Sequence, residues 1–339
     1  MIKFIQYGCG KMSKYTINFA TEAGMELVGA VDINPDVIGT DINGVTVVKA
    51  DEFEDLLKRV NPDIVIVETM SLLSDLDEVL TICASNGVNA ITTCEEAFYP
   101  SVSNPTLTAK LDALAKQNNC TITGTGYQDA FWGNLITTIA GATHNITKIK
   151  GSSSYNVEDY GIALAEVHGA GMTLEEFEEK IAAADKISKE ERNELINSGN
   201  YTPSYMWNVV PWIAEKLGLH LTDMTQKCEP LTHDTDIDST TLGMTVKAGN
   251  ATGMSAIVTG ATEEGIVIEA ECIGKVYAPG EVDTNDWTVY GSPDTRLLIT
   301  EPDTVQLTCA TIVNRIPDVI KSEAGFIPTC RMGELKYIK

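Results

Sequence analysis

A glycine turn between two short apolar runs, near the start of the chain, most constrains its fold. Residues 3–7 combine β-branched and aromatic side chains, and they lead into the turn GCGKMS at positions 8–13. A periodic segment follows, and a second apolar run at 27–31 ends on Asp32. Strand, glycine turn, helix, strand and acid, in this order, are typical of a dinucleotide-binding βαβ unit.

The residue types in this turn predict how a nucleotide is held. Gly8 makes the tight turn, and Gly10 lets the backbone approach a pyrophosphate that lies on the amides of the helix N-terminus, beside Lys11 and Met12. Asp32 would accept a hydrogen bond from a ribose hydroxyl. Its negative charge repels a 2′-phosphate, which favours NAD over NADP. The positive charge of Lys11 in the turn would weaken this preference, so NADP remains an alternative cofactor. The alternative is a glycine turn that only joins two elements, with Lys11 a solvated surface lysine.

Composition excludes several classes of function. A net charge of −24 argues against nucleic acid or anionic membranes as partners. The 8 cysteines are scattered without a CxxC pair, which indicates a reduced, cytoplasmic protein. The 4 histidines show no paired spacing, so no metal site is expected. We see no N-terminal signal and no apolar run long enough for a membrane span.

Alternating apolar runs and periodic segments predict an α/β fold with two domains. Continuous apolar runs such as 64–67 are typical of parallel strands buried on both faces, so the first part is expected to be a doubly wound Rossmann sheet. Alternating patterns between 240 and 290 predict a largely antiparallel sheet in an α+β domain. We expect a dinucleotide-binding domain of residues 1–130 and 304–339, and a substrate-binding and dimerisation domain of residues 131–303.

Two adjacent carboxylates, Glu95 and Glu96, come directly after an apolar strand and before aromatic residues. Ligands of open α/β sheets lie at the carboxyl ends of the strands. Partial burial there would raise the pKa of one glutamate enough for it to act as a base near neutral pH. The alternative is an acidic helix start favoured by the helix dipole.

Other strand ends carry further candidates. Glu68 and Thr69 are expected near the adenine or nicotinamide ribose. A glycine-bracketed segment after the strand at 121–123 is expected to meet a nicotinamide or a substrate, and it contains Gly126, Tyr127, Gln128 and Asp129. In the second domain, Tyr160 and His168 lie beside flexible glycines, and His168 is the histidine most suited to a site. A lone histidine is more often structural.

Several of these segments together resemble the dihydrodipicolinate-reductase-like dehydrogenases. They are the turn at 8–12 with Asp32, the TCEE strand end at 93–96 and the GTG strand end at 124–126. The segment GAGMTLEEF at 169–177 and the tail around Asn314 narrow the resemblance to the 2,4-diaminopentanoate dehydrogenases and their relatives, the native amine dehydrogenases. The resemblance spans the whole chain, although each motif is short.

The resemblance implies an oxidative deamination with NAD or NADP, in a homodimer joined through the sheet domain. In its most specific form, the resemblance implies that the enzyme converts 2,4-diaminopentanoate to 2-amino-4-oxopentanoate and ammonia. This reaction belongs to the fermentation of ornithine and other amino acids. A glutamate at the TCEE strand end would handle the proton of the amine. Related oxidoreductases with a Glu-Lys-Pro motif place their catalytic lysine at the second position, which favours Glu96. The sequence leaves both Glu95 and Glu96 as candidates.

The resemblance also suggests binding roles. Asn314 would contact the cofactor. Asp129, if it faces the pocket, would hold the second ammonium of a diamino acid. Arg315 and His168 are the candidates for the substrate's carboxylate.

Two alternatives remain. One is a reductase of the dihydrodipicolinate-reductase or diaminopimelate-dehydrogenase kind, which would need a cluster of basic residues; the low Lys and Arg content of the second domain argues against it. The other is a nicotinamide-sensing protein without turnover, which would keep the glycine turn and Asp32 but tolerate the loss of both Glu95 and Glu96.

Overall fold

The computed structural model describes the backbone of residues 1–339 and the side chains of all of them except Ala163 and Ala184. The chain divides into two compact units. The first contains residues 1–135, 196–202 and 303–339, and the second contains residues 136–195 and 203–302. No helix in the part of the chain described here is long and apolar enough to cross a membrane.

An eight-stranded sheet forms the centre of the first unit, in the order β16-β7-β6-β5-β1-β2-β4-β3. Its strands are β1 (Lys3–Tyr7), β2 (Glu26–Asp32), β3 (Asp41–Ile42), β4 (Val45–Lys49), β5 (Ile64–Val67), β6 (Asn89–Thr92), β7 (Thr121–Gly124) and β16 (Gly325–Phe326). All neighbours pair in parallel except β3 and β4. The strand order reverses beside β1, which is the switch point where such sheets bind ligands.

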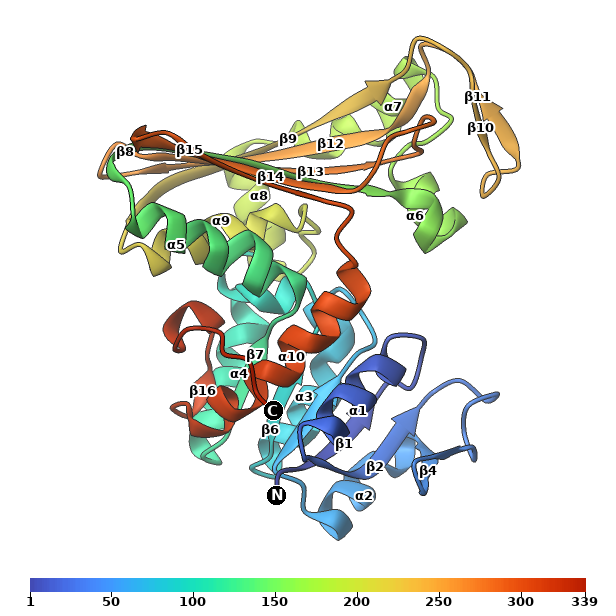
Figure 1. Cartoon of the computed structure of the whole chain (residues 1–339), viewed down its shortest axis with the longest axis vertical. Coiled ribbons are helices and arrows are strands. Elements are labelled where there is room, and N and C mark those ends of the chain that lie inside the picture. Colours follow the sequence, from blue (N-terminus) through green and yellow to red (C-terminus); the bar gives the residue numbers. More distant parts are fainter. The chain divides into compact units, whose positions relative to one another are not determined.

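Helices cover both faces of this sheet (Figure 1). Leu57, Leu80 and Leu111 pack one face, and they come from α2 (Phe53–Val60), α3 (Asp77–Ser85) and α4 (Pro105–Gln117). Ile17 and Ile312 pack the other, from α1 (Ser13–Glu22) and α10 (Thr304–Lys321). Because both faces are covered, the strands are continuously apolar, and the predicted doubly wound parallel sheet is confirmed.

The second unit contains a six-stranded sheet in the order β15-β14-β8-β13-β12-β9. All pairs are antiparallel except β8 with β13, which confirms the largely antiparallel prediction. The strands are β8 (His144–Asn156), β9 (Leu221–Thr232), β12 (Ala251–Thr262), β13 (Val267–Lys275), β14 (Thr284–Ser292) and β15 (Thr295–Thr300), with a separate hairpin of β10 (Ile237–Ser239) and β11 (Met244–Val246). The helices are α5 (Leu135–Gly141), α6 (Ile162–Val167), α7 (Leu174–Lys180), α8 (Lys189–Ser198) and α9 (Met206–Lys216).

The two faces of this sheet differ. Helices α5 and α9 lie along one of them (Figure 1), and α9 contributes the fully buried Trp212 to its core. The other face carries charged side chains among apolar ones, and there Glu269 accepts from both Lys148 and Lys150 at 2.9 and 2.8 Å. The period-two pattern of β8, β13 and β14 therefore reflects one packed and one wet face.

A glycine on β8 makes room for a tryptophan of this core. Trp287 on β14 lies directly opposite Gly151 and is 1% exposed. A Cβ at residue 151 would lie 2.0 Å from the indole ring of Trp287. The sheet can bury this tryptophan only because residue 151 has no side chain.

We expect Gly151→Ala to lower the free energy of unfolding by about 1–3 kcal/mol, because the indole must move from its packed position. Urea unfolding followed by tryptophan fluorescence measures this. Gly141→Ala is the matched control, since a Cβ there meets nothing within 4 Å. Equal stability of the two variants would contradict the packing argument.

Candidate active site

The glycine turn of the first unit has the geometry that a dinucleotide requires. Gly8 has a φ of +91°, and a Cβ there would lie 2.4 Å from the carbonyl oxygen of Glu68, so only glycine fits. A Cβ on Gly10 would meet nothing within 4 Å, which leaves the backbone open to a ligand. Met12 is the N-cap residue of α1, where no side chain among the described residues caps the helix. The helix amides are thus available to an anion.

Asp32 is held rigidly at the end of β2. It is 9% exposed, and its carboxylate accepts from the amides of Cys9 at 2.6 Å and Asn34 at 2.7 Å. Each oxygen keeps a further lone pair, so the carboxylate can still accept from a ribose hydroxyl. Lys11 is exposed in the turn. These residues fit the cofactor that the sequence suggested.

The two glutamates after β6 have different surroundings. Glu96 is buried, and its carboxylate accepts from the amide of Leu73 and the hydroxyl of Ser103, both at 2.7 Å. Glu95 is only partly buried and accepts from the hydroxyl of Ser71. Burial raises the pKa of both carboxyl groups above the ordinary value. Glu96 therefore ties its turn to the segment after β5, whereas Glu95 is less committed to other protein groups.

Close packing brings this glutamate turn against the end of β7. A Cβ on Gly124 would lie 2.3 Å from the backbone of Ala97, and the amide of Thr125 donates to the carbonyl of Thr92 at 2.9 Å. The carboxyl ends of β6 and β7 therefore pack directly against each other.

Aromatic residues follow β7 in a π-helical turn, Gln128–Asn134. Tyr127 stacks on Phe131 with ring centroids 4.4 Å apart and meets Trp132 edge-on at 5.8 Å. Trp132 is 8% exposed, and its Nε1 donor has no hydrogen-bond partner among the described residues. Such π-helical turns are frequent at functional sites, and a buried orphan donor is a position for a ligand acceptor. We did not single out Trp132 from the sequence, although its position just after a strand end was a usable signal.

Asp129 and Arg315 have a different role from the one the resemblance suggested. Both are 0% exposed, and they form a paired contact with Arg315 Nε 2.6 Å and Nη2 3.2 Å from the carboxylate. Asp129 also accepts from Thr125, Asn134 and Thr329 at 2.8–2.9 Å. The condition that Asp129 face a pocket is not met, and Arg315 is not available to a substrate carboxylate. The pair instead joins α10 to the π-helical turn.

Gln128 and Gly126 also serve this local structure. The Gln128 side chain is buried and donates to the carbonyl of Thr125 at 3.1 Å. Gly126, at a φ of +138°, lies against Thr308 of α10, whose hydroxyl accepts from the amide of Tyr127 at 3.2 Å.

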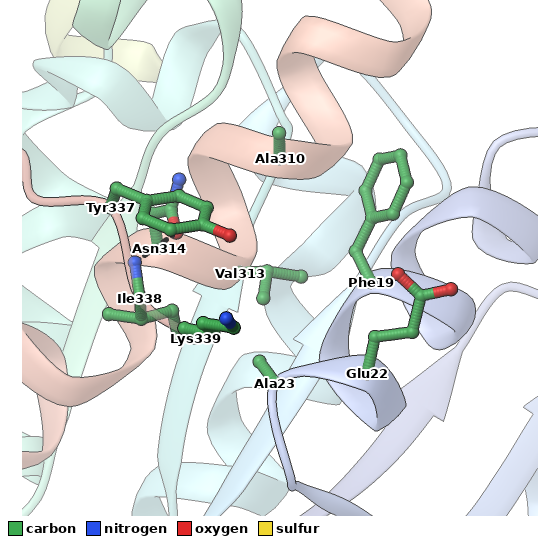
Figure 2. A pocket seen from close by; sticks show the side chains of 9 residues that line it. All are labelled: Phe19, Glu22, Ala23, Ala310, Val313, Asn314, Tyr337, Ile338 and Lys339. Carbon is green, nitrogen blue, oxygen red and sulfur yellow. Dashed lines mark hydrogen bonds between the residues drawn. The ribbon is translucent and has the colours of Figure 1, made fainter.

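Asn314 lies on α10 beside a surface pocket at the chain's C-terminal segment (Figure 2). Its side-chain oxygen accepts from the amide of Ile338 at 3.1 Å. The pocket, of about 390 Å³, is lined by Phe19, Glu22, Ala23, Ala310, Val313, Asn314, Tyr337, Ile338 and Lys339. Phe19 and Glu22, the pocket residues that belong to α1, lie in the half of this helix away from the glycine turn. The predicted contact of Asn314 with a cofactor is therefore not supported by its position.

In the second unit, His168 is buried and both ring nitrogens are occupied. Nδ1 lies 2.7 Å from the carbonyl of Leu164, so it carries the proton, and Nε2 accepts from Tyr155 at 2.7 Å. Desolvation lowers the pKa of His168, which keeps it neutral. The His168 ring packs closely on Gly274, where an added Cβ would lie 2.3 Å from the ring. These contacts favour the structural role that a lone histidine usually has.

Tyr160 is 52% exposed and meets the ring of Tyr155 edge-on at 5.7 Å. The predicted substrate contact of Tyr160 stays a prediction.

With this geometry in place, comparisons with known proteins are informative. Residues 132–336 match the family model for the 2,4-diaminopentanoate dehydrogenase C-terminal domain. The chain belongs to this family. It is 24% identical to the 2,4-diaminopentanoate dehydrogenase of Acetoanaerobium sticklandii, over 99% of this chain and 96% of that protein.

Two solved structures extend the comparison. The amine dehydrogenase from Mycobacterium smegmatis is 36% identical, with a TM-score of 0.83 over 99% of this chain and 97% of that one. A dihydrodipicolinate reductase from Paenisporosarcina sp. TG-14 shares the fold, with 14% identity and a TM-score of 0.51 over 96% of each chain. The protein is accordingly a dehydrogenase of the amine dehydrogenase family, as its sequence motifs indicated.

Glu68 is partly buried at the end of β5, next to the glycine turn. Its carboxylate accepts from Thr16 Oγ1 at 2.6 Å and from Gln6 Nε2 at 2.9 Å. Burial raises its pKa to about 7, against the opposing effect of these two hydrogen bonds. Thr69 is exposed, and its methyl group would lie 2.7 Å from a Cβ on Gly8.

This partly buried acid makes stability depend on pH. The folded state holds the proton of Glu68 up to a pH of about 7, whereas the unfolded chain releases it near the ordinary value of 4.5. The contribution of Glu68 is therefore fully present below about pH 4.5 and falls, by roughly 3 kcal/mol in total, as the pH rises through 7. We expect Glu68→Gln to unfold like the wild type at pH 5 and at higher urea concentration at pH 8. Equal stability of the two proteins at pH 8 would contradict this.

Proposed function

We propose that this protein is an NAD(P)-dependent amine dehydrogenase that oxidatively deaminates 2,4-diaminopentanoate to 2-amino-4-oxopentanoate and ammonia. The observation that supports this most directly is the turn after β6, where Glu95 stands at the carboxyl end of the sheet with a raised pKa. The neighbouring glycine turn and Asp32 suit a dinucleotide. We further propose a cytoplasmic location, consistent with eight free cysteines.

In this proposal Glu95 is the catalytic base. NAD(P), when bound, accepts a hydride from the carbon that carries the amine. Glu95 takes a proton from the substrate's ammonium group, so that the nitrogen lone pair can form the double bond to carbon as the hydride leaves, and it releases this proton to solvent. It then takes a proton from the water that adds to that carbon and passes it to the nitrogen, which leaves as ammonia, while the new hydroxyl loses its remaining proton to solvent as the carbonyl forms. Glu96 cannot do this without giving up its bonds to Leu73 and Ser103. We therefore assign it a positioning role, in contrast to the preference from the Glu-Lys-Pro comparison.

Paired variants test this division of roles. Glu95→Gln is expected to lower the turnover number about 10²–10⁴-fold, the usual contribution of a general base, with NADH binding unchanged. Glu96→Gln is expected to retain more turnover but to unfold at lower urea concentration. In the wild type, kcat/KM should fall as the pH drops through the raised pKa of Glu95, because its protonated form cannot act as a base. Full activity of Glu95→Gln would remove this residue from the reaction.

Trp132 is our candidate for substrate recognition. The substrate's carboxylate needs a donor, and Arg315 and His168 are both committed to other protein groups. The buried Nε1 of Trp132 has no partner among the described residues, and it follows the same strand end that packs on the glutamate turn. We propose that it donates to the carboxylate.

Trp132→Phe keeps the ring and removes this donor. We expect the KM for 2,4-diaminopentanoate to rise about tenfold, because a hydrogen bond to a charged group contributes about 1.5–3 kcal/mol. The KM for a simple amine without a carboxylate should change little. Initial rates of NAD(P) reduction with both substrates measure this, and equal effects on the two would contradict the assignment.

A second substrate class is an amine or ketone without a carboxylate. The higher identity to the Mycobacterium smegmatis amine dehydrogenase favours it, at 36% against 24%. Reduction of NAD and of NADP with 2,4-diaminopentanoate and with a panel of simple amines decides between the two classes. Activity only with simple amines would overturn the diamino acid assignment and keep the reaction type.

We also propose a homodimer formed through the wet face of the second unit's sheet. Lys148, Lys150 and Glu269 give this face charges of both signs, so two copies related by a two-fold axis can match each other. Sedimentation velocity should then give about twice the chain mass of 36.6 kDa. A monomer at micromolar concentration would contradict it.

A further inference from the structure

A buried polar cluster connects the glycine turn, α1 and the end of β5. Gln6 Nε2 donates both to the carboxylate of Glu68 and to the carbonyl of Gly8, each at 2.9 Å. Thr16, in the first turns of α1, donates to the other oxygen of Glu68 at 2.6 Å. Gln6 and Thr16 are both 0% exposed. The proposed cofactor role of the turn does not use this cluster.

The orientation of Gln6 fixes where a proton on Glu68 would be. Its Oε1 has no partner among the described residues, but turning the amide over would set this oxygen against the carbonyl of Gly8, which is also an acceptor. Glu68 Oε2 must therefore accept from Gln6. A proton on Glu68 then lies on Oε1 and is donated to Thr16 Oγ1, which reverses the direction of that hydrogen bond. The cluster can accommodate both protonation states without moving a heavy atom.

The two cysteine thiols that interact with Glu68 stay uncharged. Cys9, in the turn, and Cys309, on α10, interact with it, and burial raises the pKa of their thiols to about 12 and about 11. Lys11 and Lys14 are exposed in the turn and on α1. Asp32 is the nearest further acid that interacts with Cys9. No cation is therefore buried with Glu68 in the described cluster, and its own ionisation sets the charge next to the turn.

We propose that Glu68 is a positioning residue of the cofactor site that takes up a proton when the dinucleotide binds. This rests on the proposed binding of the cofactor at the glycine turn. The positive potential of the α1 N-terminus stabilises the Glu68 carboxylate in the free protein. A pyrophosphate at the same helix end offsets that potential and repels the carboxylate, so the protein binds the dinucleotide best with Glu68 protonated.

Linkage gives the sign of the effect. Because the complex holds the proton more tightly than the free protein, dinucleotide affinity must fall as the pH rises through the range where Glu68 ionises. That range is close to neutral, since burial already raises the pKa of Glu68 to about 7. The 4 histidines lie at positions 144, 168, 220 and 233, and Glu68→Gln keeps them all, so a pH dependence that came from a histidine would persist in that variant.

The test is the dissociation constant of NADH, measured by nicotinamide fluorescence between pH 6.5 and 8.5. We expect Kd to rise about tenfold over this range in the wild type, a typical coupling between two sites. In Glu68→Gln, which keeps both hydrogen bonds without the charge, Kd should stay constant. Glu22→Gln is the matched control, because Glu22 is an exposed acid at the other end of α1, and it should behave like the wild type.

Calorimetry gives a second readout that needs no variant. Titration of NADH into the wild type at pH 7.5, in two buffers of different ionisation enthalpy, should show net proton uptake. A pH-independent Kd, a slope that persists in Glu68→Gln, or the absence of proton uptake would each overturn the proposal while leaving the cofactor site intact. Failure to bind NADH or NADPH at any pH would instead overturn the cofactor site itself.

Discussion

The buried ion pair between Asp129 and Arg315 is the interaction on which the site of the first unit depends. Both residues are fully buried, so each needs the other to offset its desolvation. The pair fixes α10 against the π-helical turn after β7, and Thr125, Asn134 and Thr329 add hydrogen bonds to the same carboxylate. Leaving either charge unpaired would cost about 3–5 kcal/mol, so this junction has little freedom to move.

That rigidity matters because the π-helical turn carries the aromatic cluster. Tyr127, Phe131 and Trp132 keep their mutual geometry only if the turn is held against the sheet. Gly124 then lets the glutamate turn pack directly on the end of β7. A site for a small amine requires donors and a base that are positioned in advance, since binding energy is otherwise lost to ordering them.

Carboxyl groups in this unit have three distinct roles that follow from their partners. Asp129 forms a buried ion pair with a guanidinium. Asp32 meets backbone amides at a strand end and remains partly accessible. Glu68 meets only neutral donors, and burial raises its pKa to about 7. The same carboxyl group thus forms a buried ion pair, accepts from backbone amides at a strand end, or has a raised pKa, and the neighbouring atoms determine which.

The sequence by itself determined the local features. The glycine turn, the apolar strands and the two glutamates after β6 follow from residue type and period, because turn geometry and strand burial act over a few residues. Only the tertiary structure decided which carboxyl groups are bonded to other protein groups. Arg315 lies 186 positions from Asp129, and Gln6 lies 62 positions from Glu68, so their pairing has no local signal. The same holds for Asn314, which meets the C-terminal segment, and for Glu96, whose partner Leu73 lies 23 positions away. The physical reason is that desolvation and charge pairing depend on what surrounds a group in space, and a folded chain brings those neighbours from distant positions.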